Sequence, residues 1–166
     1  MKKILGRHLL LPILLSLTIS GIPANAITRQ KMVNLIQRTG VTVSRRSNCG
    51  SNGKAAAHYE PRNNAICIAE SEYRDTRDWD QALTHEAIHM VQDCIAGLNN
   101  ASMMTLGQNT GYEPDFVTYI RQRGNRWVTF IKRHYRPAYY ELELEAYALQ
   151  GRPDVVSKLI QKECLS

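Results

Sequence analysis

The stretch that decides the fold is Asp78–Ala96, which reads DWDQALTHEAIHMVQDCIA. Asp78 is a residue type that caps helix N-termini, and Gln81 three residues later can complete a capping box. Gly97 follows directly after the stretch, where helices commonly end. Apolar residues recur at three- and four-residue spacing, at Leu83, Ala87, Met90 and Cys94. This spacing predicts one long helix with a face directed at the core.

Two histidines one helical turn apart lie in the middle of this helix, in His85-Glu86-Ala87-Ile88-His89. Side chains four positions apart on a helix share a face, so both imidazoles can bind one metal ion. Zinc accepts imidazole nitrogen, and a catalytic zinc site usually has three protein ligands and one water. Glu86 is placed beside that water and can take its proton. The motif therefore predicts a zinc-dependent hydrolase, and a peptidase in particular.

The third zinc ligand is expected from the acidic segment Glu141–Ala148, which is predicted to be helical. On a helix Glu143 and Ala146 share one face, while Glu141 and Glu145 share a different one. A small residue beside the ligand lets two helices approach closely, which favours Glu143. Glu141 and Glu145 are each interpreted as surface charges, although both stay open as alternative ligands.

The two motifs together, His85-Glu86-Ala87-Ile88-His89 and the later Glu143-Leu144-Glu145-Ala146, resemble those of the gluzincin-type zinc metallopeptidases. The resemblance implies that Zn²⁺ is bound by His85, His89 and Glu143, and that Glu86 is the general base of peptide-bond hydrolysis. It also implies a zincin-like fold. In such a fold an edge strand just before the active-site helix, here Ala65–Ala69, lines the cleft and pairs with an extended peptide.

Residues near these motifs supply alternatives and candidate helpers. Asp93, one turn past His89, is a rival third ligand or a partner of a ligand. Many members of the resembled family carry an aspartate directly after the alanine of the second motif, where it supports a zinc-bound histidine. This chain departs from that pattern, because Tyr147 stands there. Three further residues are candidates for stabilising an oxyanion, although a structural or solvent-facing role is favoured for each: His134, Tyr139 and Tyr140.

Residues 1–26 are predicted to be a signal peptide. The apolar run Leu9–Ile22 is short for a membrane span and contains Pro12, and Ala24-Asn25-Ala26 fits a cleavage site with small residues. A positively charged start precedes the run, with Lys2, Lys3 and Arg7. The expected product is residues 27–166, a single metallopeptidase-like domain that is exported and not stably inserted in a membrane.

The charge balance excludes some functions. The chain has 21 Lys and Arg residues against 15 Asp and Glu residues, a formal net charge of +6. Loss of the signal peptide removes three basic residues, so 18 against 15 leaves +3. This mild charge does not indicate nucleic-acid binding, and the basic residues of 121–136 are interpreted as solvated helix faces. The expected partner is a peptide or protein substrate, and the oligomeric state stays open.

The four cysteines, at positions 49, 67, 94 and 164, all follow the signal peptide. An even count in an exported chain favours disulfides. Of the three possible pairings we predict Cys49–Cys67 with Cys94–Cys164. The first closes a local turn, and the second ties a C-terminal helix to the active-site helix. A second zinc site is disfavoured because no Cys-x-x-Cys spacing occurs.

The remaining chain predicts an α+β fold, zincin-like and mainly helical, with a small antiparallel sheet preceding the active-site helix. Helices are expected over Thr28–Arg38, from Glu113 with a pause at Gly124-Asn125, over Tyr139–Gln150, and from Pro153 to about Glu163. Three strands are expected, at Val41–Ser44, around Ala57-His58-Tyr59, and around Ala65–Ile68 after a hairpin connector at Pro61–Asn64. Leu98–Tyr112 has few ordering signals and is either a lid or a long connection.

A different class of function fits the same motifs. The chain can be a non-catalytic binding module, exported and stabilised by zinc, that uses the metal only for its fold. Chelation distinguishes the two, because an open catalytic site loses activity with little unfolding whereas a structural site loses the fold.

Overall fold

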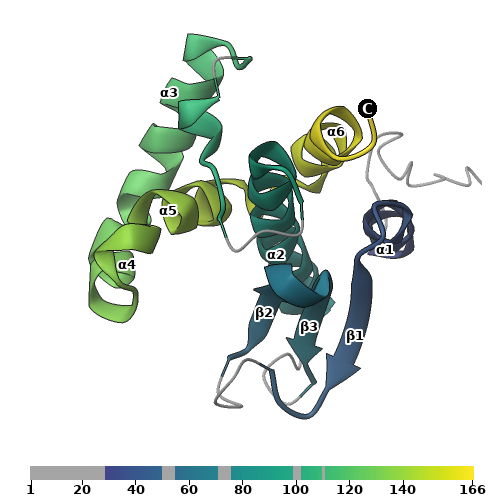
Figure 1. The fold of residues 1–166 in the computed structure, drawn as a ribbon. Helices are drawn as coiled ribbons and strands as arrows, with labels where there is room; N and C mark the ends of the chain where they lie inside the picture. Colours follow the sequence, from purple (N-terminus) through teal and green to yellow (C-terminus); the bar gives the residue numbers. More distant parts are fainter. Residues whose placement is uncertain (1–28, 50–54, 71–75, 99–101, 110) are drawn as a thin grey trace, which may run out of the picture.

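The computed structural model describes residues 29–49, 55–70, 76–98, 102–109 and 111–166 (Figure 1). These residues form a mainly helical fold with one small sheet, which confirms the α+β class. The expected signal peptide, residues 1–26, lies outside the described residues. Among the described helices, none combines the length and the apolar character needed to cross a membrane.

The sheet is mixed, so the expectation of an antiparallel sheet was wrong. Its spatial order is β1-β3-β2, and β3 pairs parallel to β1 and antiparallel to β2. The strands are β1 (Thr42–Arg46), β2 (Ala57–Glu60) and β3 (Ala65–Ala69). β3 is the most apolar strand and takes the centre, where Ile66 and Ile68 are fully buried. β1 ends in two arginines, which suit an edge.

This order also corrects the expected place of the edge strand. Ala65–Ala69 was expected to be an edge that pairs with a peptide, but both of its sides are already paired. β2 is an edge strand instead. The predicted hairpin connector between β2 and β3 is confirmed: Pro61–Asn63 form a 3-10 turn, and Asn64 has a left-handed backbone (φ 45°).

The central element is α2 (Thr76–Ala96), the helix that carries both histidines. It begins before Asp78, so the predicted cap at Asp78 was wrong. The Asp78 carboxylate lies in the first turn, where a negative charge interacts favourably with the helix dipole. Every residue from Ala82 to Asp93 is buried. The helix therefore has no exposed face along this length, although Ala82, His85, Glu86 and His89 border pockets. Gly97, predicted to stand beyond its end, has φ 88°, a conformation that ends helices.

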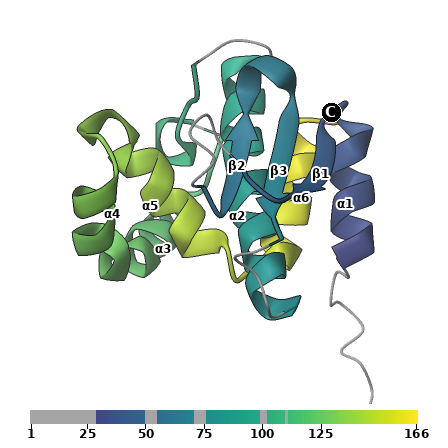
Figure 2. The same cartoon turned by 90° about the horizontal axis from the view of Figure 1, so that it is seen from below.

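Other elements enclose α2 from several directions. β2 and β3 pack against it, as do α5 (Tyr140–Leu149) and α6 (Pro153–Glu163). Figure 2 shows α5 with α3 (Pro114–Gly124) and α4 (Val128–His134) on one side of α2, and α6 with α1 (Arg29–Arg38) on the other. The helix pause predicted at Gly124-Asn125 is confirmed as a 3-10 turn between α3 and α4. The helices predicted over Thr28–Arg38, Tyr139–Gln150 and Pro153–Glu163 are found within a residue of their bounds, although Thr28 itself is not described.

The described part of Leu98–Tyr112 is anchored to the helices beside it. Thr105 and Leu106 are buried, and Leu106–Gln108 form a 3-10 turn. The Met104 N–H donates to the carbonyl of Gln92 on α2. Residues 99–101 and 110 lie outside the described residues. The segment is therefore a connection fixed at its middle to α2.

Both predicted disulfides are confirmed. Cys49–Cys67 joins the chain after β1 to the central strand, and Cys94–Cys164 joins the end of α2 to the chain after α6. No described cysteine is free. The second bridge fixes α6 against the helix that carries the histidines.

Candidate metal site

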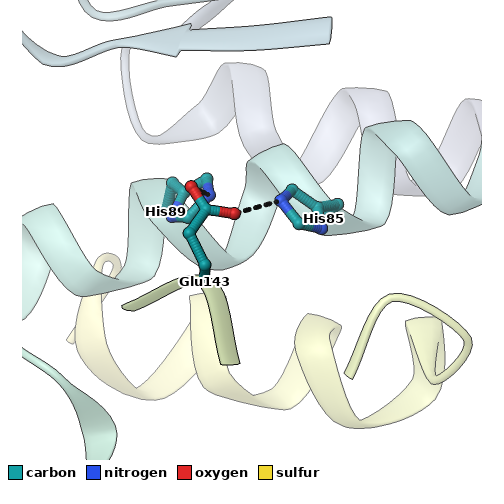
Figure 3. Close-up of side chains that lie close together, drawn as sticks. All are labelled: His85, His89 and Glu143. Atoms are coloured by element: carbon teal, nitrogen blue, oxygen red, sulfur yellow. Dashed lines mark ion pairs between the residues drawn. The ribbon is translucent and has the colours of Figure 1, made fainter. Parts of the chain in front are cut away.

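Three buried side chains from two helices converge on one point (Figure 3). His85 and His89 project from α2, and Glu143 projects from α5 toward them. Each is only 8% exposed. Glu143 Oε2 lies 3.3 Å from Nε2 of His85, and Glu143 Oε1 lies 3.5 Å from Nε2 of His89. Among the residues expected as ligands, the structure thus brings these three together.

The separations fit ligands of one cation better than hydrogen bonds. A charged N–H to carboxylate bond is usually about 2.7–2.9 Å long. Two ligands held about 2.1 Å from a tetrahedral metal lie about 3.4 Å apart, which matches the two observed contacts. Glu143 Oε2 is also buried without a hydrogen-bond partner among the described residues. An unsatisfied carboxylate oxygen between two imidazoles is costly unless a cation binds there. The residues present therefore fit a metal ion.

The cluster shifts the pKa of two of its members. Burial acts to raise the pKa of Glu143, but contacts with His85 and His89 outweigh it and lower the pKa to about 2. Burial likewise acts to lower the pKa of His89, but contact with Glu143 and the charges of Glu143 and Glu86 raise it to about 9. In the metal-free protein, His89 and Glu143 therefore form a buried ion pair at neutral pH.

Glu86 lies where two pockets meet. One pocket, of about 320 Å³, adjoins a second, of about 240 Å³, and only the second is lined by all three clustered side chains. Both are lined by the same central residues, Ala55, Ala57, His85, Glu86 and Tyr135. The Glu86 side chain is almost buried yet borders both spaces. A carboxylate in this position can exchange protons with a molecule bound beside the histidines.

Two tyrosines lie beside the cluster: Tyr135, whose place the sequence did not indicate, and Tyr147, which stands where the resembled family has an aspartate. Their hydroxyl groups lie 3.3 Å apart, and the Tyr147 ring packs edge-on against His85 with ring centroids 4.6 Å apart. Burial, followed by the charge of Glu143, raises the pKa of Tyr135 above its ordinary range. Its hydroxyl therefore stays protonated and can donate a hydrogen bond. Tyr135 follows α4 in a short break before Pro137, and no periodicity or motif distinguishes it from the neighbouring tyrosines.

The rival ligands lie outside the cluster. Asp93, one turn past His89, is buried but not part of the cluster, and it accepts a 2.8 Å hydrogen bond from Tyr59. Glu141 is exposed, as predicted. Glu145 was expected to be a surface charge, and that was wrong: it is 5% exposed. Its carboxylate accepts hydrogen bonds from the backbone N–H groups of Leu106 and Gly107, which turn it away from the histidines.

The three candidate oxyanion residues lie in different surroundings. His134 is exposed, stacks on Phe130 and contacts its carbonyl, so it does not reach the cluster. Tyr140 donates to the carbonyl of Lys132. Tyr139 lines the smaller pocket but is 49% exposed. The favoured structural or solvent-facing role fits all three residues better than a place beside the ligands.

Comparison with known proteins adds a family and no function. Searches of curated proteins and of solved structures find no significant match. A family described as a domain of unknown function, DUF8637, matches residues 25–165. This span contains the whole described fold, including the three clustered side chains. The chain therefore belongs to the DUF8637 family.

Proposed function

We propose that this protein is an exported zinc-dependent peptidase of the gluzincin type. The observation that carries the proposal is the convergence of His85, His89 and Glu143 beside Glu86, at the junction of two pockets. Two imidazole nitrogens and one carboxylate are a common donor set of catalytic zinc sites. The same donors suit zinc better than magnesium or calcium, which prefer oxygen ligands alone.

Each nearby group has a role in this proposal. Bound zinc supplies a Lewis acid that polarises the substrate carbonyl and acidifies a water molecule. Glu86 takes a proton from the attacking water and returns it to the leaving amine, because its carboxylate borders both pockets. Tyr135 donates a hydrogen bond to the oxygen on which negative charge develops, since its hydroxyl stays protonated.

The pockets support an extended peptide as the substrate. Because the two pockets adjoin at His85 and Glu86, residues before and after a scissile bond can each occupy one of them. β2 borders the smaller pocket through Ala57, His58 and Tyr59 and is an edge of the sheet. An extended chain can add to such an edge through backbone hydrogen bonds. We therefore assign substrate pairing to β2 instead of Ala65–Ala69.

Export is the second part of the proposal. Two disulfides are typical of oxidising compartments outside the cytosol. The N-terminal pattern of positive charge, short apolar run and small residues agrees with this location.

Two substitutions test the peptidase directly. Glu86→Gln keeps the side-chain size and spares the ligands, so we expect one equivalent of zinc and a cleavage rate lower by about 10²–10⁴-fold. Glu143→Ala is expected to lose the zinc as well as the activity. Glu141→Gln on the exposed face of α5 is the matched control and should retain both. The measurements are metal content by mass spectrometry and cleavage of a generic peptide mixture. Full activity in the Glu86 variant would refute the proposed general base.

Chelation separates the peptidase from a zinc-stabilised binding module. We expect chelated protein to lose cleavage while its circular dichroism spectrum stays folded, because the two disulfides and the enclosed α2 hold the fold without metal. Unfolding on chelation, with no cleavage by the zinc-loaded protein, would favour the binding module.

A further inference from the structure

A chain of buried hydrogen bonds leads away from His89 on the side opposite the metal cluster. His89 Nδ1 lies 2.8 Å from Oε1 of Gln92, which stands three residues later on α2. The Gln92 amide nitrogen lies 2.9 Å from Oε2 of Glu145 and 3.1 Å from the carbonyl of Leu142. Gln92 is fully buried. Neither Gln92 nor Glu145 belongs to the proposed zinc ligands.

The partners of Gln92 determine which way its amide points. A carboxylate and a backbone carbonyl only accept hydrogen bonds, so the group facing Glu145 and Leu142 must be the donating NH₂. The Gln92 carbonyl oxygen is then the group that faces His89, and it only accepts. His89 Nδ1 must therefore carry a proton. A neutral His89 has its lone pair on Nε2, the nitrogen that lies 3.5 Å from Glu143.

The far end of the chain is fixed by backbone. The Glu145 carboxylate accepts from the N–H groups of Leu106 at 2.8 Å and Gly107 at 2.9 Å, in addition to Gln92. These two N–H groups belong to the 3-10 turn Leu106–Gln108 and cannot reorient as a side chain can. Glu145 is thus held as an acceptor in a set position between α5 and this turn.

We propose that Gln92 and Glu145 are positioning residues that hold His89 with Nδ1 protonated and the Nε2 lone pair directed at the metal. The inference rests on the proposed function, because it assigns Nε2 to a bound zinc ion. Glu145 orients the Gln92 amide, and the amide orients the ring of His89. Hydrogen-bond partners behind a zinc ligand typically contribute about 10–100-fold to metal affinity.

Two variants interrupt the chain at different points. Gln92→Met has a similar length but neither accepts from His89 nor donates to Glu145. Glu145→Gln is nearly isosteric, but its new NH₂ group opposes the NH₂ of Gln92 or a backbone N–H. A flip of the Gln92 amide would relieve this opposition of two donors, but it would also remove the acceptor from His89 Nδ1. Matched controls are Met90→Leu, a volume-conserving change in the core beside Gln92, and Glu141→Gln, the same chemical change on the exposed face of α5.

The experiment measures three quantities on the full mature protein. Zinc affinity comes from competition with a chelator, and the ligand geometry comes from the visible absorption spectrum of the cobalt(II)-substituted protein. Nitrogen-15 NMR of the histidine rings detects a slowly exchanging proton on His89 Nδ1 in metal-free and zinc-loaded samples. We expect Gln92→Met and Glu145→Gln each to weaken zinc binding by about 10–100-fold, to alter the cobalt spectrum and to lose the slow proton. The double variant should lose no more than the stronger single variant, because both act through one chain.

The outcomes distinguish this inference from the proposed function. Zinc affinity within about twofold of wild type in both variants, with the His89 proton intact, would overturn the positioning role alone. Equal losses in the two controls would also overturn it, because the effect would then come from general loosening of the core. A wild-type protein that binds no zinc would overturn the proposed function, while the NMR signal would still report whether Gln92 accepts from His89.

Discussion

Burial makes each ionisable side chain at the cluster depend on its neighbours. His89 and Glu143 are almost excluded from water, so each charge is stable only beside a charge of the opposite sign. In the zinc-loaded protein of our proposal the cation supplies that charge. In the metal-free protein a proton on His89 supplies it, which is why the pKa of His89 is raised and that of Glu143 is lowered.

The stability of the metal-free protein should therefore depend on pH through this pair. The lowered pKa of Glu143 stabilises the fold above about pH 4.5, and this contribution is lost as the pH falls through about 2. The raised pKa of His89 stabilises the fold below its ordinary pKa of about 6.5, and this contribution is lost as the pH rises through about 9. We expect the stability difference between wild type and Glu143→Gln to be largest between about pH 4.5 and pH 6.5, where both contributions are fully present.

Urea unfolding of both metal-free proteins from about pH 2 to pH 10 measures this difference, since it covers both shifted values. Subtracting the unfolding free energy of the variant from that of wild type removes the contributions that both proteins share, such as those of the buried Asp93 and Glu145. A difference that does not change with pH would show that His89 and Glu143 are not coupled in the metal-free state.

At the scale of residues, the sequence predicts the cluster well and its surroundings poorly. The i, i+4 spacing on a helix sufficed to place His85 and His89. The shared face with Ala146 favoured Glu143 but left Glu141, Glu145 and Asp93 open, and the structure brings Glu143 to the histidines. Glu145 looked like a surface charge because its partners are backbone N–H groups of a turn 38 residues earlier or more. Backbone donors carry no signature in the amino-acid sequence, so neither Glu145 nor its contact with Gln92 could be expected.

At the scale of elements, the approach of α3 to α5 sets the position of Glu143. Gly124 ends α3 where the two helices meet, and a Cβ there would lie 2.4 Å from Cδ2 of Leu144 and 2.8 Å from its backbone oxygen. The backbone oxygen cannot move away as a side-chain tip can. Since Leu144 adjoins Glu143, a displacement of α5 at this point also moves the carboxylate.

We therefore expect Gly124→Ala to lower stability by about 1–3 kcal/mol, the usual range for overpacking a core. Urea unfolding measures the loss, and a chelator competition shows whether zinc affinity falls with it. Gly151→Ala is the control, because a Cβ at Gly151 meets no atom within 4 Å. Unchanged stability in the Gly124 variant would mean that α3 and α5 can separate without strain, against the packing described here.

Local signals predicted helices more accurately than sheet topology. Pro114 and Pro153 marked the starts of α3 and α6, and Gly151 marked the end of α5 to within two residues. The strands were also located correctly, but the antiparallel sheet and the edge position of Ala65–Ala69 were wrong, because β3 lies between β1 and β2. β3 pairs directly with β1, although β2 lies between them in the sequence. β3 takes the central position because it buries its apolar side chains best there. This burial depends on the packing of α1 and α2 against the sheet.

At the scale of the whole molecule, the two disulfides join segments that are separated in the sequence. Cys94–Cys164 closes a loop with a sequence separation of 70 and fixes α6 to the end of α2. Cys49–Cys67 closes a separation of only 18 and stays within the sheet region. Neither bridge passes through α5, so neither directly fixes Glu143 against the two histidines. The disulfides should therefore affect global stability more than the metal site.

Removing each bridge tests whether the disulfides affect global stability more than the metal site. From loop length alone, Cys94→Ala with Cys164→Ala should cost about 4 kcal/mol, and Cys49→Ala with Cys67→Ala about 3 kcal/mol, because the longer loop restricts the unfolded chain more. Urea unfolding gives both values, and zinc titration at low temperature compares the sites in protein that is still folded. We expect zinc affinity in both variants to stay within about threefold of wild type, since partners behind the ligands remain in place. If loss of Cys94–Cys164 instead weakened zinc binding tenfold or more, α6 would have to hold α2 in register with α5, and the metal site would depend on the whole molecule as one unit.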